Sequence, residues 1–146
     1  MAKRSSGVII DEYSVKSNWE NVRLDEANKR FLLLTYSSPN EITLSMQGTG
    51  GLVDLIGSLN DDDVYFGGFR INIEGSTKFL SLFFVGSSVN GMKRGKASLH
   101  KNAILNILDG CHGEITLNGL DDCKLEDVIT KIARLFRIDD ISRISF

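Results

Sequence analysis

Proline and cysteine are both scarce in this chain of 146 residues, which contains one proline and two cysteines. Two cysteines, Cys111 and Cys123, are too few for the disulfide framework of a small secreted domain, so a reducing compartment is the simplest interpretation. Only three apolar residues precede Asp11 after the polar start, which is not a signal peptide. The longest apolar run is far too short to span a membrane. The sequence therefore predicts a cytoplasmic protein that is not an integral membrane protein.

An excess of charge of either sign is also missing. Lys and Arg total 17 against 19 acidic residues, which gives a formal charge of −2. A dedicated nucleic-acid-binding protein usually has a clear basic excess, so no nucleic-acid partner is expected. The basic residues are nevertheless distributed unevenly, and four of them fall within residues 93–101. A partner would respond to this local charge and not to the net charge.

Motifs for catalysis and for metal binding are missing as well. Cys111 and His112 are adjacent, and neighbours on a strand point to opposite faces, which is poor geometry for a nucleophile and its base. A zinc site that adds His100 and Cys123 would lack the usual ligand spacing. The acidic run at 61–63 lacks the alternating ligands of an EF-hand. We therefore expect no enzyme activity, no cofactor and no metal.

The order of the periodic segments predicts a mixed fold. The expected elements are a helix at 11–26, strands at 31–36 and 41–46, a short helix at 52–59, strands at 64–73 and 79–85, a helix ending near 108, a strand at 113–118 and a helix at 125–137. The strand from Phe79 is apolar throughout, so both of its faces should be covered. We expect an α+β protein, an α/β/α sandwich whose central mixed sheet is mostly antiparallel and flanked by helices.

Local signals predict where elements begin and bend. Asp11 is a plausible N-cap of the first helix, and Asp121 with Asp122 is expected to cap the last one. The glycine pair 67–68 suggests a β-bulge. Gly95 lowers helix propensity, which predicts a kink or a late start in the basic helix.

One folded domain accounts for most of the chain. Residues 1–10 are expected to form a flexible N-terminal arm and residues 11–137 the domain itself. Residues 138–146 form a semi-apolar tail that could add an edge strand or dock on the core.

The stretch Lys78–Leu108 is the most informative part of the chain. An apolar strand leads into a basic segment, which contains Lys93, Arg94, Lys96 and Lys101 with no acidic residue among them. A helix face that serves solubility alone usually mixes charges of both signs. We interpret the segment as a surface that binds an acidic protein partner.

These residues resemble the actin-depolymerising-factor homology (ADF/cofilin) family, and most closely its coactosin branch. Lys78 leads the apolar strand, the run Val89-Asn90-Gly91-Met92-Lys93-Arg94-Gly95-Lys96 opens the long helix, and Lys101 follows five residues later. The resemblance is strongest from Asp62 to Lys101. It implies a mixed sheet between pairs of helices and a monomer that binds actin, filamentous more than monomeric, at the actin cytoskeleton.

The resemblance also implies a set of contact residues. The candidate actin-binding residues are Lys78, Lys93, Arg94, Lys96, Lys101, Arg70, Lys131 and Arg134. Among them, Lys131 and Arg134 would lie near a second, filament-specific contact. Actin is acidic, so complementary charge would steer association and make it sensitive to salt.

Two features are closer to the cofilin branch and leave alternatives open. Ser5-Ser6-Gly7-Val8 is similar to the cofilin start, where a serine before Gly-Val is phosphorylated, so Ser5 and Ser6 are candidate phosphorylation sites whose phosphate would repel actin. The run Lys101-Asn102-Ala103-Ile104 is also cofilin-like. The alternatives to binding filament sides are cofilin-type severing and depolymerisation, binding of the branched-filament nucleating complex, and binding of phosphoinositides through the basic helix.

Overall fold

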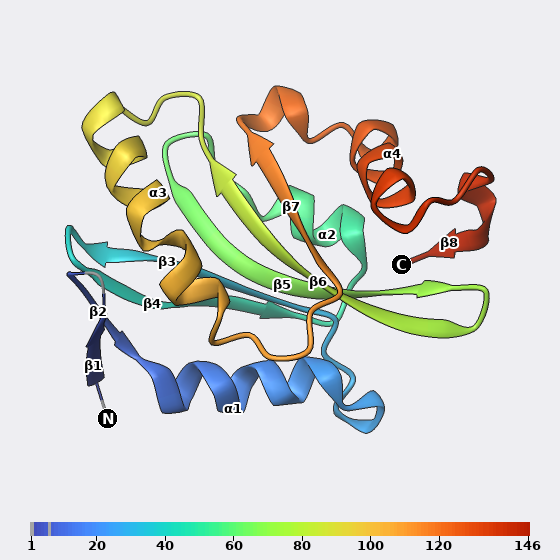
Figure 1. Ribbon diagram of the computed structural model, residues 1–146, viewed down its shortest axis with the longest axis horizontal. Helices are drawn as coiled ribbons and strands as arrows, with labels where there is room; N and C mark the ends of the chain where they lie inside the picture. The colour runs from blue at the N-terminus through green and yellow to red at the C-terminus, as the bar shows by residue number, and fades with distance from the viewer. Residues whose placement is uncertain (1, 6) are drawn as a thin grey trace.

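The computed structural model describes residues 2–5 and 7–146, and within them the strands form one sheet (Figure 1). The strands are β1 (Ala2–Ser5), β2 (Val8–Asp11), β3 (Phe31–Ser38), β4 (Glu41–Gly48), β5 (Val64–Ile73), β6 (Ser76–Val85), β7 (Gly113–Asn118) and β8 (Ile144–Ser145). The α-helices are α1 (Glu12–Arg23), α2 (Leu52–Gly57), α3 (Gly91–Leu105) and α4 (Leu125–Phe136). Short 3₁₀ turns are η1 (Asp25–Ala27), η2 (Leu120–Asp122) and η3 (Ile141–Arg143).

The sheet is mixed and mostly antiparallel, as predicted. Its strand order is β1-β2-β4-β3-β5-β6-β7, and β8 pairs with β5 outside this path. The pairs β2–β4 and β6–β7 are parallel, whereas the other pairs are antiparallel. The α+β assignment and the sandwich architecture are therefore confirmed.

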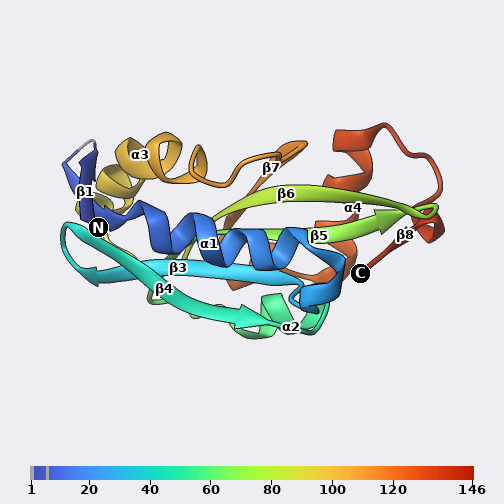
Figure 2. The ribbon, with the colours of Figure 1, turned by 90° about the horizontal axis from the view of Figure 1, so that it is seen from below.

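Helices cover both faces of the sheet, and Figure 2 shows α3 and α2 on opposite sides of it. Side chains of α1 and α3 pack with Phe66 and Phe83 in one core cluster. Side chains of α2 and α4 pack with Tyr65 and Phe84 in another. Neighbouring strand residues point to opposite faces, so each central strand feeds both cores. This explains why the apolar run of β6 shows no alternation.

The start of the chain is more ordered than the sequence suggested. Val8 and Ile10, predicted to belong to a flexible arm, are buried in the core beside α1. Strand β2 pairs in parallel with the start of β4, where Ile10 lies opposite Ile42. Residues 8–10 are therefore part of the sheet. Near the other end, Ile144 is buried and pairs with Ile73, so the tail adds a short strand.

The glycine pair in β5 does not form a bulge. Its pairing register with β3 and β6 is continuous through Gly67 and Gly68. Both positions are crowded instead: a Cβ at Gly67 would collide with the carbonyl of Leu32, and one at Gly68 would collide with the ring of Trp19. The prediction of a bulge was wrong because close packing, not strand irregularity, requires glycine here.

The helix ends also differ in part from the predictions. Asp11 caps α1 and accepts a hydrogen bond from the backbone N–H of Ser14 at 3.1 Å, as predicted. Asp122 does not cap α4; it lies in η2 and accepts from the N–H of Asn118 at 3.0 Å. Helix α3 is continuous from Gly91 to Leu105, so the expected late start is wrong.

Candidate functional site

Helix α3 connects the parallel strands β6 and β7 across one face of the sheet. Asn90 fixes its start, because the side chain of this residue accepts a hydrogen bond from the N–H of Lys93 at 2.9 Å. The side chains of Ala97 and Ile104 are fully buried against the sheet. The remaining faces of the helix are consequently held toward solvent in a fixed orientation.

The outward face of α3 combines apolar and cationic side chains. Met92 and Leu99 are 86% and 76% exposed. Lys96 lies between them at helical spacing, so the three form one stripe along the helix. Large exposed apolar side chains beside a cation are typical of a binding surface. The sequence prediction missed Met92 and Leu99, although their spacing outside the inward stripe was a usable signal.

Two further cations of α3 contact neighbouring parts of the protein. The Nη2 atom of Arg94 donates to the carbonyl of Gly86 at 3.0 Å and so ties the helix to the loop after β6. The Nζ atom of Lys93 lies 5.9 Å from the ring centroid of Tyr36 on β3. Both residues are half-buried. Lys93, Arg94, Lys96, Met92 and Leu99 are called the helix surface below.

Lys101 differs from the other lysines of α3 because its charge is paired. Its Nζ atom lies 2.9 Å from Oε2 of Glu114 on β7 and 5.7 Å from the ring centroid of Phe83. A partly exposed pair of this kind contributes little to stability. It does reduce the positive potential that Lys101 would present to a partner, so we leave this residue outside the helix surface.

Lys78 lies at the opposite end of β6 from α3. It precedes Val85, the last residue of the strand, by about seven residues, or roughly 23 Å of extended chain. Its side chain has the same parity as Leu80 and Leu82, which pack toward α4. The structure therefore does not bring Lys78 together with the helix surface.

Helix α4 supplies cations on the same face of the sheet as Lys78. Arg134 is exposed, whereas the Nζ atom of Lys131 lies 3.7 Å from Oδ1 of Asp122. The end of α4 approaches the start of β6 through a chain of rings: the centroid of His112 lies 6.5 Å from that of Phe136 and 6.2 Å from that of Phe79. Lys78 and Arg134 are called the strand surface below, whereas Lys131, whose charge is paired with Asp122 as that of Lys101 is with Glu114, is left outside it.

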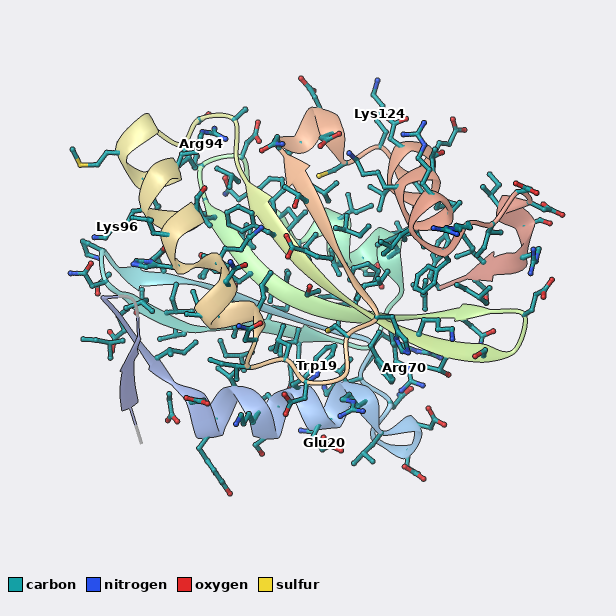
Figure 3. All side chains as sticks on the ribbon, in the orientation of Figure 1. Trp19, Glu20, Arg70, Arg94, Lys96 and Lys124 are labelled. Atoms are coloured by element: carbon teal, nitrogen blue, oxygen red, sulfur yellow. The ribbon has the colours of Figure 1, made fainter. Side chains whose placement is uncertain are left out.

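Arg70 is buried, with only 9% of the residue exposed. Its Nη1 atom donates to the carbonyl of Val22 at 2.9 Å and to that of Arg23 at 3.4 Å, both at the end of α1. Its Nη2 atom pairs with Asp25, and its guanidinium lies over the ring of Phe79. In Figure 3 it lies toward the opposite end of the sheet from Arg94 and Lys96. These contacts favour a structural role for Arg70 over contact with a partner.

The two candidate phosphorylation sites lie at the N-terminal hairpin. Ser5 is the last residue of β1 and pairs with Val8 of β2. Ser6 lies outside the described residues. The turn continues at Gly7, which has a φ of 78° that favours glycine.

Burial and hydrogen bonds shift the pKa values of two titratable side chains, Tyr36 and Asp61. Burial raises the pKa of Tyr36 to about 12, and its hydroxyl lies 2.7 Å from Nδ1 of the buried His100. In the loop between α2 and β5, Asp61 accepts from the N–H and hydroxyl of Ser87 and from the N–H of Leu120, and these bonds lower the pKa of Asp61. The loop that precedes α3 is thereby fixed to two others.

No metal centre appears in the described ranges 2–5 and 7–146, where no three His, Cys, Asp or Glu side chains gather at coordinating distance. Burial also raises the pKa of both the Cys111 and Cys123 thiols to about 11, which leaves them poor nucleophiles near neutral pH. Among the helices described, none has the length and apolar content needed to cross a bilayer. The helix surface and the strand surface are therefore the candidate binding sites.

Comparison with known proteins assigns a family to this fold. Residues 7–133 match the model of the family described as cofilin/tropomyosin-type actin-binding protein. The chain is 30% identical over 105 residues to a drebrin-like protein of Mus musculus, which covers 70% of this chain and 24% of that protein. The chain thus spans about a quarter of that relative's length. It is 22% identical to a coactosin of Dictyostelium discoideum, covering 86% of this chain and 89% of the relative.

A solved structure agrees with this assignment of the fold. The crystal structure of coactosin from Entamoeba histolytica superimposes with a TM-score of 0.76 at 24% identity, covering 91% of this chain and 99% of that one. At this identity the likeness supports the fold alone. The predicted architecture and the predicted family are both confirmed.

Proposed function

Since the chain belongs to the cofilin/tropomyosin-type family of actin-binding proteins, which are not enzymes, we propose that it binds the sides of actin filaments and does not sever them. The helix surface contacts one actin subunit, and the strand surface contacts a second subunit of the same filament. The protein acts as a monomer at the actin cytoskeleton of the cytoplasm.

The separation of the two surfaces carries this proposal. Lys78 and the loop that leads into α3 are at opposite ends of one rigid strand, roughly 23 Å apart. They also face different sides of the sheet, because α3 packs on one core and Lys78 points toward the other. A single flat patch on one partner would not meet both surfaces. Two adjacent subunits of a polymer would.

The composition of the helix surface supports a protein partner. Exposed Met92 and Leu99 provide apolar contact area, while Lys93, Arg94 and Lys96 surround it with positive charge. Interfaces typically place apolar groups centrally and charged groups at the rim, where charge sets association rate and salt sensitivity. We therefore expect filament affinity to fall as ionic strength rises.

Co-sedimentation with actin filaments tests the proposal. Lys96→Glu on the helix surface and Lys78→Glu on the strand surface should each weaken binding to filaments. The matched control is Lys16→Glu, which replaces a lysine of α1 that belongs to neither surface and is 51% exposed. The proposal fails if all three variants sediment like the wild type at physiological salt.

Binding to monomeric actin separates the two surfaces. Lys96→Glu should weaken binding to monomers and filaments alike, whereas Lys78→Glu should weaken binding to filaments only. Microscopy of single filaments then distinguishes side binding from severing, because a cofilin-type protein would increase the number of filament ends. Vesicles that contain phosphoinositides, added without actin, identify the lipid-binding alternative.

A further inference from the structure

A groove of about 400 Å³ lies beside the helix surface and has no assigned role. One wall is the end of β3 and the β3–β4 turn, from Tyr36 to Pro39. The other wall is the first turns of α3, which contribute Met92, Lys93 and Lys96. In Figure 3 Lys96 lies on the side of α3 that faces this turn.

The aromatic ring that lines the groove, that of Tyr36, is held in a fixed position. The hydroxyl of Tyr36 lies 2.7 Å from Nδ1 of His100, a buried residue of α3. The ring itself packs edge-on against Phe66, with centroids 5.8 Å apart. The groove therefore offers a rigid apolar base that needs little rearrangement on binding.

The charge of the groove has one sign. None of its lining residues is acidic, and two lysines, Lys93 and Lys96, stand on one wall. The ammonium group of Lys93 lies over the Tyr36 ring, 5.9 Å from the ring centroid, at the mouth of the apolar base. A complementary ligand combines an apolar group that fills the groove with carboxylates that meet the lysines.

We propose that this groove receives an apolar side chain from an acidic segment of actin, so that the β3–β4 turn is part of the interface. This inference rests on the proposed function, because the groove adjoins the helix surface and shares Met92, Lys93 and Lys96 with it. The segment enters beside Met92, covers Tyr36 and places its carboxylates against the two lysines. The turn thereby contributes to affinity although the turn itself, Ser37 to Pro39, carries no charge.

Filling the groove tests the inference. Ser38 lines the groove and is exposed, so Ser38→Trp should occupy the space intended for the partner's side chain. We expect this variant to bind filaments about tenfold more weakly, the effect of losing one apolar anchor. Ser38→Ala should bind like the wild type. Val53→Trp on α2, at a site 58% exposed and outside both surfaces, is the control for adding an indole.

The outcomes separate the two proposals. If wild-type protein does not sediment with filaments, the proposed function fails. If wild type binds and Ser38→Trp, shown to be folded by circular dichroism, binds equally well, the groove is not part of the interface and this inference alone is overturned.

Cross-linking provides an independent readout. A photoreactive maleimide on Ser38→Cys should form a covalent adduct with actin, mapped by mass spectrometry to a segment that contains acidic and apolar residues. The native thiols interfere little, because burial raises their pKa to about 11. The same probe on Val53→Cys should give no adduct. Absence of the adduct from Ser38→Cys that still binds filaments, or its mapping to a basic segment, would refute the inference.

Discussion

Replacing Arg70 by methionine should lower the free energy of unfolding by about 2–4 kcal/mol and leave the filament affinity of the folded protein unchanged. Methionine keeps the apolar stem of the side chain and removes its donors. The carbonyls of Val22 and Arg23, which Arg70 contacts at 2.9 and 3.4 Å, would then lose a charged donor at the end of α1. Each such loss at a buried position costs about 1–3 kcal/mol, and the longer contact contributes the smaller share.

The ion pair of Arg70 contributes less to stability than the hydrogen bonds that Arg70 donates to the two carbonyls. Its partner Asp25 has a side chain that is 79% exposed, and solvent screens a pair of this kind to about 0–1 kcal/mol. Asp25→Asn should therefore destabilise the protein far less than Arg70→Met. Arg70→Lys should fall between them, because an ammonium group cannot donate to two carbonyls with the fixed fork of a guanidinium.

Denaturation in urea measures these differences. The midpoint should shift while the slope m stays constant, since the surface exposed on unfolding is unchanged. If Arg70→Met lies within about 0.5 kcal/mol of the wild type, the assigned structural role is refuted. If this folded variant also loses filament binding, the sequence-based assignment of Arg70 to the interface was right.

The remaining predictions concern packing, pH and thiol chemistry. Gly68→Ala should lower the free energy of unfolding by about 1–3 kcal/mol, because the added Cβ collides with Trp19. Trp19→Phe removes the colliding atoms, so in urea denaturation the double variant should lose less stability than the two single variants combined. Hydrogen bonds lower the pKa of Asp61 from 3.8, so the stability that this carboxylate contributes is present above pH 3.8 and is lost as the pH falls through the lower, folded-state pKa. The melting temperatures of the wild type and Asp61→Asn should accordingly differ more at neutral pH than at pH 3, and a constant difference would contradict this. Cys111 and Cys123 should react slowly with a thiol reagent at pH 8 and rapidly after unfolding; fast labelling of the folded protein would be inconsistent with their raised pKa of about 11.

Most of the secondary structure could be predicted from the regular spacing of apolar residues. The inward residues Val15, Trp19 and Val22 identified α1, and the uninterrupted apolar run of β6 indicated a central strand. Residues 8–10 were missed, because three apolar residues after a polar start cannot be distinguished locally from a frayed terminus. Their burial depends on a partner strand that begins at Glu41.

The candidate site was predictable in its charges and not in its geometry. The lysines and arginines around α3 could be read from the sequence, and family resemblance added Lys78. The sequence could not show that the guanidinium of Arg70 donates hydrogen bonds to the end of α1, because the contact joins residues 48 positions apart. Nor could it reveal the groove, whose two walls come from β3 and α3 and meet only in the folded protein.

Because α3 is the crossover between two parallel strands, the surface it presents is set before any partner arrives. Rotating or shifting this helix would disturb the pairing of Leu80 with Gly113 at one end of β7 and of Val85 with Asn118 at the other. The conformational entropy that is lost when α3 becomes ordered is therefore lost during folding, and binding does not incur this loss again. We expect amide hydrogen exchange in α3 to be slow in the unbound protein and to change little on binding, so that the conformational adjustment falls to the partner.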